Sequence, residues 1–364
     1  MSYIETQYRL YVVGERPFCF WASDVSQQTL RFLESLDPSY FESIANVFIP
    51  NINESQTNEG LSLFRRLQRR LKLLQFNKIN QNECDSQHAA LALRLTYSQS
   101  LETLFALIGA TVQAPRCAHA WMAKYKPSEL RKILQDIQNH RSFPWQLKET
   151  TPSWNAVSDC IFNSLVLDDE EKEANIKKAY SQFWAHLASD FVKQDFTDEY
   201  NSIKHGLRVK LGGFSFAIGK EDEPGVPAPK DKMQLLGRSD YGSSFSIFEK
   251  IGENNLHHQS KNLSRNWSPI DIAWALHLVS MSISNVISAL KILNGIPADQ
   301  VKFMWPDNLN ILSEPWKRTK KLGITTMGMI GHPIHPVRIK PFTKEEILTN
   351  YSIGKDGGVI RIDY

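Results

Sequence analysis

The stretch SPIDIAWALHLVSMSISNVISALKILNG, residues 268–295, contains the most apolar window of the chain. Ser268 can cap a helix that has Pro269 in its first turn, and Gly295 can end that helix. A helix that spans a membrane needs about 20 mostly apolar residues. The window is too polar for that role, because it contains His277, Asn285, Lys291 and four serines. We therefore predict a buried helix in the core of a soluble protein.

Other long helices are indicated by the spacing of apolar residues. They are predicted at residues 60–76, 85–112 and 168–205. The acidic run at residues 168–171 suits the positive end of the third helix dipole, and Gly206 can stop this helix. Shorter helices are expected at residues 26–36 and 38–47 and after Pro127. Together with residues 268–295, these segments predict a helical bundle.

Strands are predicted in two places. Residues 8–12 and 18–20 alternate apolar and polar side chains around a turn at residues 14–17, which predicts a β-hairpin. Residues 207–251 are predicted to form short strands, the first two of which would flank a hairpin turn at Gly212-Gly213. The predicted fold class is α+β, mainly α: a helical bundle with an N-terminal β-hairpin and a small inserted β-sheet before the last long helix.

The domain organisation follows from these elements. Residues 1–84 would hold the β-hairpin and helices that include a basic amphipathic helix. Residues 85–295 would form the helical bundle with inserted strands at 207–251, and residues 296–364 an irregular C-terminal extension. A chain of 364 residues is longer than one typical core fills, so one large or two closely packed domains are expected.

Charge and cysteine usage narrow the class of protein. The chain has 42 Lys and Arg against 39 Asp and Glu, and a net charge of +3 does not by itself indicate a nucleic-acid or membrane partner. Its cysteines are too far apart for a CxxC metal site or a dense disulfide framework. They are Cys19, Cys84, Cys117 and Cys160. Because no signal peptide is evident, we expect a cytoplasmic protein with reduced thiols.

The stretch Tyr200-Asn201-Ser202-Ile203-Lys204-His205-Gly206-Leu207-Arg208 carries the most suggestive chemistry. The apolar stripe of the preceding helix runs through Ile176, Tyr180, Phe183, Leu187 and Phe191. Continued in steps of three and four, it reaches Gln194, Asp198, Asn201, His205 and Arg208. Polar groups that point into a bundle must be hydrogen-bonded or line a cleft. Asn201 and His205, four residues apart, would lie side by side on that face.

Two structural alternatives remain open for this stretch. A break near Gln194 could rotate the helix and place Asn201, Lys204 and His205 at or near the surface. The buried stripe would then consist of Phe196, Tyr200, Ile203 and Leu207. His205 could instead close the C-terminus of the helix, where a cation is favoured. Solvent exposure of His205 separates a functional site from a structural helix end.

The Asn201-x-x-x-His205 segment, late in a long bundle helix, resembles the motif of the HEPN superfamily. That motif is an arginine, usually a polar residue, several residues and then a histidine. The resemblance, which spans residues 85–295 by helix order, implies a helical bundle. It also implies a homodimer whose paired motifs meet, and an RNA-cleaving or RNA-binding effector of a bacterial defence or toxin-antitoxin system. Tyr200 stands where the arginine of the family belongs, so Lys204 or Arg208 would have to supply the cation.

The residue types suit metal-independent cleavage of RNA, which needs a base for the 2′-hydroxyl and charge stabilisation at the phosphate. A histidine, with an ordinary pKa of about 6.5, can serve as acid or base at neutral pH. Lys204 and Arg208 could balance the phosphate charge. The candidate catalytic residues are therefore His205, Asn201, Lys204 and Arg208. Without the arginine of the family, a phosphate-binding or nucleotide-binding pocket that performs no cleavage is the alternative.

A second candidate is a row of basic residues on the predicted helix at 60–76. It consists of Arg65, Arg66, Arg69, Arg70 and Lys72. Such a row could bind a nucleic-acid backbone, although many such rows are simply the solvated face of a helix. His332 and His335 are spaced loosely like metal ligands but have no cysteine or acidic partner nearby, so we predict no metal site and no cofactor.

These observations lead to a functional hypothesis and two rivals. The hypothesis is a HEPN-like effector that binds or cleaves RNA. We expect it to form a homodimer, to have a partner protein from a defence system and not to bind a membrane. One rival is a non-catalytic sensor or scaffold that binds a partner protein or a nucleotide. The other is a housekeeping helical domain whose polar stretch only ends a helix.

Overall fold

The computed structural model describes residues 8–49, 83–147, 151–220, 226, 228–251, 257–313, 329–333, 343 and 345. Helices dominate it, and the predicted α+β, mainly α class is confirmed. The helices are α1 Ala22–Ser35, α2 Tyr40–Phe48, α4 Glu83–Gln113, α5 Ala118–Lys124, α6 Pro127–Gln138, α7 Trp154–Ile161, α8 Glu170–Phe191, α9 Gln194–Lys204 and α10 Pro269–Leu293. Short 3-10 helices lie at Pro115–Cys117, Lys230–Lys232, Ala298–Gln300 and Leu309–Ser313.

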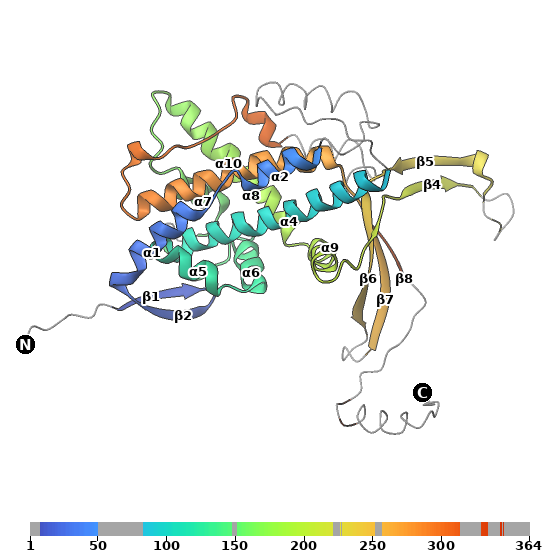
Figure 1. The fold of residues 1–364 in the computed structure, drawn as a ribbon, viewed down its shortest axis with the longest axis horizontal. Coiled ribbons are helices and arrows are strands. Elements are labelled where there is room, and N and C mark those ends of the chain that lie inside the picture. Colours follow the sequence, from blue (N-terminus) through green and yellow to red (C-terminus); the bar gives the residue numbers. More distant parts are fainter. Residues whose placement is uncertain are drawn as a thin grey trace, which may run out of the picture.

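The core helix predicted from the apolar stretch is α10, which packs against α4 and α2 (Figure 1). Ser268 caps it by accepting a hydrogen bond from the amide of Asp271, and Gly295 follows its end with a φ of +99°. Among the described residues, only α10 is long and apolar enough to cross a membrane, and 72% of its most apolar window is buried inside the fold. This placement is that of a bundle core helix.

Three polar residues of α10 have partners within the bundle or in the chain that follows it. His277 Nδ1 lies 3.0 Å from a carboxylate oxygen of Glu42 in α2. Ser282 accepts a hydrogen bond of 3.0 Å from the indole of Trp184 in α8. Asn285 exchanges hydrogen bonds with the backbone of Met304, which fixes the chain that follows α10 against the bundle. A buried polar group is tolerated when it is bonded in this way.

The predicted N-terminal hairpin is formed by β1 Tyr8–Val13 and β2 Arg16–Trp21. Gly14 takes a φ of +63° in its tight turn, and its N–H and carbonyl both bond the Gln113 side chain at the end of α4. Arg16 donates two hydrogen bonds to the carboxylate of Glu129 in α6. These contacts attach the hairpin to one end of the bundle (Figure 1).

A small β-sheet lies at the other end of the bundle. Its strand order is β3-β6-β7-β8, and β4 and β5 form a separate two-stranded ribbon that projects from the body (Figure 1). The strands are β3 Lys210–Leu211, β4 Ser215–Gly219, β5 Met233–Arg238, β6 Gly242–Ile251, β7 His257–Asn266 and β8 Met329–Pro333. The inserted strands thus continue past residue 251 to Asn266, and residues 329–333 add a strand to the same sheet.

The hairpin predicted across Gly212-Gly213 is wrong. β3 pairs with β6, and β4 pairs with β5. Gly213 serves a different purpose, because a Cβ atom there would lie 2.1 Å from the backbone oxygen of Ser239 and 2.9 Å from Oδ1 of Asn266. The glycine is thus needed for close approach of two backbone segments.

Candidate functional site

The helix predicted at residues 168–205 is broken at Val192-Lys193 into α8 and α9. The break lets Phe191 and Phe196 contact each other, with ring centroids 5.8 Å apart. Residues five apart on one continuous helix do not face each other, since neighbours on a helix surface are three or four apart. The inward polar stripe predicted from a continuous helix is therefore wrong, and the alternative of a break near Gln194 is confirmed.

The break decides which residues of α9 are buried. Of the alternative stripe, Phe196 and Ile203 are buried, Tyr200 is half-buried and Leu207 is exposed. Glu199 and Ser202, which neither prediction placed in the core, are buried with them.

The candidate residues lie at or near the surface. Asn201 is half-buried, and Lys204, His205 and Arg208 are exposed at the C-terminal end of α9. We call these three exposed residues the α9 tip. His205 ends the helix, and its backbone N–H bonds the carbonyl of Asn201 at 2.9 Å. Asn201 and His205 are therefore joined through their backbones.

A reversal of the chain after His205 brings the backbone of Arg208 back to the last turn of α9. Gly206 and Leu207 both take left-handed conformations, with φ of +92° and +49°. The N–H of Arg208 then bonds the carbonyl of Ser202 in the last turn of α9, at 2.7 Å. Gly206 thus stops the helix as predicted. A left-handed leucine is strained, and such strain is found preferentially at functional positions.

Tyr200 occupies the place of the arginine in the HEPN motif. Its hydroxyl donates a hydrogen bond of 3.1 Å to Glu102 in α4, which also accepts one from Tyr125. Burial and the charge of Glu102 raise the pKa of Tyr200 above its ordinary value, so it stays neutral. The ammonium of Lys204 lies 5.2 Å from the centre of the Tyr200 ring, within cation–π range. Lys204 therefore places a positive charge beside this position.

A buried ion cluster, which the sequence reasoning missed, lies on the opposite side of α9. Glu199 accepts hydrogen bonds of 3.2 and 2.6 Å from Arg94 of α4, 2.6 Å from Ser243 of β6 and 2.9 Å from the indole of Trp267. Burial raises the pKa of Glu199, but the charges of Arg94 and Arg265 and the hydrogen bonds outweigh it, so the pKa lies below its ordinary value. The cluster joins α9 to the bundle and to the sheet.

Arg265 of β7 completes the cluster less tightly. Its Nη1 lies 3.5 Å from Glu199 and 3.8 Å from Asp195, and among the described residues this buried nitrogen has no hydrogen-bond partner. The Phe196 ring lies close to both guanidinium groups, 5.0 Å from that of Arg94 and 5.8 Å from that of Arg265. Burial lowers the pKa of Arg265. The cluster is a structural anchor that holds the exposed α9 tip in place.

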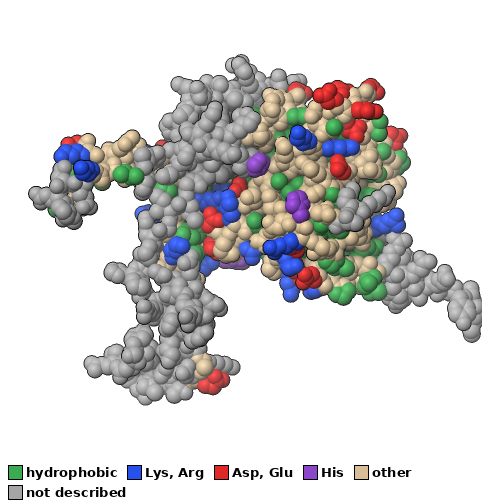
Figure 2. All heavy atoms as spheres, turned by 180° about the vertical axis from the view of Figure 1, so that it is seen from behind, with side chains coloured by type: hydrophobic (Ala, Val, Ile, Leu, Met, Phe, Trp, Pro, Cys, Tyr) green, Lys and Arg blue, Asp and Glu red, His purple; other side chains and the backbone are tan. Residues whose placement is uncertain are grey.

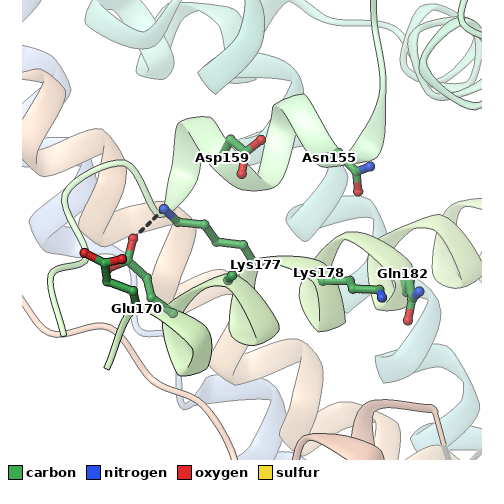
Figure 3. A pocket seen from close by; sticks show the side chains of 8 residues that line it. Asn155, Asp159, Glu170, Lys177, Lys178 and Gln182 are labelled. Atoms are coloured by element: carbon green, nitrogen blue, oxygen red, sulfur yellow. Dashed lines mark hydrogen bonds and ion pairs between the residues drawn. The ribbon is translucent and has the colours of Figure 1, made fainter. Parts of the chain in front are cut away.

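An open cleft of about 700 Å³ lies between α7 and α8 (Figure 3). Both signs of charge line it: Asp159, Glu170 and Glu173 beside Lys177 and Lys178. Lys177 is already bonded to Glu173 at 2.6 Å. In Figure 2, acidic side chains gather over the bundle at the end away from the β4–β5 ribbon. A cleft with mixed charge favours a polyanion less than the α9 tip does, and it contains none of the predicted site residues.

The structure gives no support to the other two candidate sites, which are the basic row and the histidine pair. The basic row from Arg65 to Lys72 and His335 lie outside the described residues. His332 lies on β8, where the backbone register pairs it with Asn262. Within the described part of the chain, no group of three or more His, Cys, Asp or Glu side chains could hold a metal ion.

Comparison with known proteins adds no relative: no family model, no curated protein and no solved structure matches the chain.

Proposed function

We propose that this protein is a HEPN-like, RNA-binding effector whose α9 tip contacts the phosphate backbone. Lys204 and Arg208 would supply the positive charge, and His205 and the half-buried Asn201 would add hydrogen-bonding groups. Phosphates attract exposed cations regardless of sequence. The α9 tip offers such cations on a helix end that is held from behind by the buried ion cluster.

The observation that carries this proposal is the chain reversal at Gly206 and Leu207. Without it, Arg208 would leave the end of α9, and the cations would not share one surface. The hydrogen bond from the Arg208 amide to Ser202 keeps this reversal closed. The backbone strain at Leu207 is retained on an exposed residue, where packing does not demand it.

Binding without cleavage is the form that the geometry favours. The position of the motif arginine holds Tyr200, which is neutral and bonded to Glu102. The charge that develops at a phosphate during cleavage would have to be met by Lys204 or Arg208. His205 is exposed and able to reach a substrate, so cleavage by a metal-independent endoribonuclease is the further claim that a separate experiment must test.

The cellular setting follows from the resemblance. We propose a cytoplasmic protein of a bacterial defence or toxin-antitoxin system, which acts as a homodimer together with a partner protein. A dimer would bring two α9 tips together and double the positive charge that faces one RNA. Light scattering after size-exclusion chromatography measures the mass in solution, and a monomer at all accessible concentrations would contradict the dimer.

Fluorescence anisotropy with labelled RNA tests the binding proposal. We expect the double variant Lys204→Gln/Arg208→Gln to bind RNA more weakly than wild type, irrespective of the RNA sequence. The matched control is Lys178→Gln/Arg141→Gln, which removes the same charge at exposed positions of the bundle. Equal losses in both double variants would contradict a site at the α9 tip.

Gel analysis of the RNA after incubation tests cleavage. Cleavage by wild type that disappears in folded His205→Ala and weakens in Asn201→Ala would establish the endoribonuclease. Binding with no cleavage of several RNAs by wild type would leave the protein as an RNA-binding effector.

A scaffold that binds a partner protein is the second candidate function. The β4–β5 ribbon projects from the body and exposes Ile218, Met233 and Leu235, of which Leu235 is 58% exposed. Exposed apolar groups of this kind are typical of protein interfaces. This function predicts that Leu235→Ser changes association with a protein and leaves RNA binding unaffected.

A further inference from the structure

The outer face of the β3-β6-β7-β8 sheet is identified by the alternation of β6. Ser243 points toward the bundle, where it bonds Glu199, and Phe245 is buried on the same side. Successive side chains of a strand point to opposite faces. Ser244, Ser246 and Phe248 therefore face away from the bundle.

The register extends this outer face across three strands. Directly opposed residues of paired strands lie on the same face. Lys210 of β3 is opposite Ser244, Asn262 of β7 is opposite Ser246, and Ser260 is opposite Phe248. The outer face is thus defined by Lys210, Ser244, Ser246, Phe248, Ser260 and Asn262. A hydrogen bond of 2.7 Å between Ser244 and Ser264 confirms that the side chains of β6 and β7 meet on this face.

The composition of the outer face suits a polyanion with exposed bases. Its side chains are hydroxyl and amide groups, one exposed lysine and one aromatic ring, and the positions named above include no carboxylate. Phe248 is 63% exposed, on the part of β6 that pairs with β7 and extends beyond the short strand β3. An exposed aromatic ring on a sheet can stack on an unpaired base, and the hydroxyl and amide groups can bond base edges.

The outer face begins close to the α9 tip along the chain. Lys210 follows Arg208 by two residues, a Cα distance of at most about 7 Å. Ser244, opposite Lys210, is four residues from Phe248 along β6, or about 14 Å. Lys210 therefore places a positive charge between the α9 tip and the face that holds the aromatic ring.

We infer that the outer face of this sheet binds single-stranded RNA, with Phe248 stacked on a base and Lys210 on a phosphate. This inference rests on the proposed function, of which it specifies the substrate class. Bases of a duplex are stacked within the helix and out of reach of Phe248, so the inference requires a preference for single strands. The two surfaces would then have different roles: the α9 tip supplies positive charge, and the outer face contacts bases.

Anisotropy titrations of Phe248→Ala with single-stranded and duplex RNA test the inference. Loss of one stacked base is worth about 1–3 kcal/mol, so we expect the affinity for single strands to fall roughly 5- to 150-fold, with a much smaller change for duplex RNA. Phe248→Tyr should restore binding because it keeps the ring. Val166→Ala, an exposed apolar position between α7 and α8, is the control and should bind as wild type does. Circular dichroism verifies folding of each variant.

The outcomes separate this inference from the proposed function. If Phe248→Ala binds single strands as wild type does while Lys204→Gln/Arg208→Gln loses affinity, the outer face is not the site and the α9 tip remains. Equal affinity of wild type for duplex and single-stranded RNA would also overturn the inference. If wild type binds no RNA, both proposals fail.

Discussion

Arg94 of α4 donates two hydrogen bonds to one carboxylate oxygen of Glu199 of α9, with both side chains at most 2% exposed. The other oxygen of Glu199 accepts from Ser243 of β6 and Trp267, which follows β7. One buried carboxylate thus connects the bundle, α9 and the sheet. A buried charge is stable only when it is paired and fully bonded, so each of these elements depends on the others at this point.

Replacing Glu199 by glutamine should destabilise the protein strongly. The amide has nearly the same shape but leaves Arg94 in the interior without its counter-charge, and Arg265 with only the more distant Asp195. Breaking a buried ion pair from one side typically costs about 3–5 kcal/mol. Urea denaturation measures the loss, and Glu171→Gln, at an exposed position in α8, is the matched control. A loss as small as in the control would show that the cluster contributes little to stability.

The same carboxylate should make stability depend on pH in the acid range. The pKa of Glu199 is below its ordinary value of 4.5 in the folded protein. Its contribution is therefore complete above pH 4.5 and is lost as the pH falls through the folded-state pKa, because the unfolded chain takes up the proton first. We expect the difference in unfolding free energy between wild type and Glu199→Gln to shrink below pH 4.5. Urea denaturation at a series of pH values measures this, and a constant difference would count against it.

The sequence predicted the helices best where a cap and a stop frame an apolar pattern. Ser268 and Gly295 frame α10, and Gly206 follows α9 as predicted. The break between α8 and α9 has no proline or glycine to signal it. It lets Phe191 and Phe196 pack against each other, and such packing cannot be read from the local sequence.

The buried ion cluster left a weak signal in the sequence. Glu199 lies three residues after Phe196 and four before Ile203, so all three share one helical face. A single acidic residue on an apolar face indicates a buried partner, but Arg94 and Arg265 are far away in the sequence. The prediction of a hairpin at Gly213 failed for a similar reason. The residues that Gly213 approaches, Ser239 and Asn266, are also far away in the sequence.

Replacing Gly213 by alanine should destabilise the junction between β3 and β4. The new Cβ would lie 2.1 Å from the backbone oxygen of Ser239, which cannot move as a flexible side chain can. Overpacking of this kind typically costs about 1–3 kcal/mol. Thermal denaturation should show a lower midpoint for Gly213→Ala than for wild type. The midpoint of Ser215→Ala, at an exposed position in β4, should be unchanged. An unchanged midpoint in Gly213→Ala would mean that the two backbone segments can separate without cost.

The salt dependence of RNA binding should report the two cations of the α9 tip directly. Each phosphate contact to a single strand contributes about 0.7 to the slope of the logarithm of affinity against the logarithm of salt concentration. If Lys204 and Arg208 each contact one phosphate, Lys204→Gln/Arg208→Gln should reduce the magnitude of this negative slope by about 1.4. Phe248→Ala should weaken binding at every salt concentration and leave the slope unchanged, because stacking releases no counterions. Titrations across a range of salt concentrations measure both quantities. A double variant that loses affinity without a change in slope would place Lys204 and Arg208 away from the phosphates.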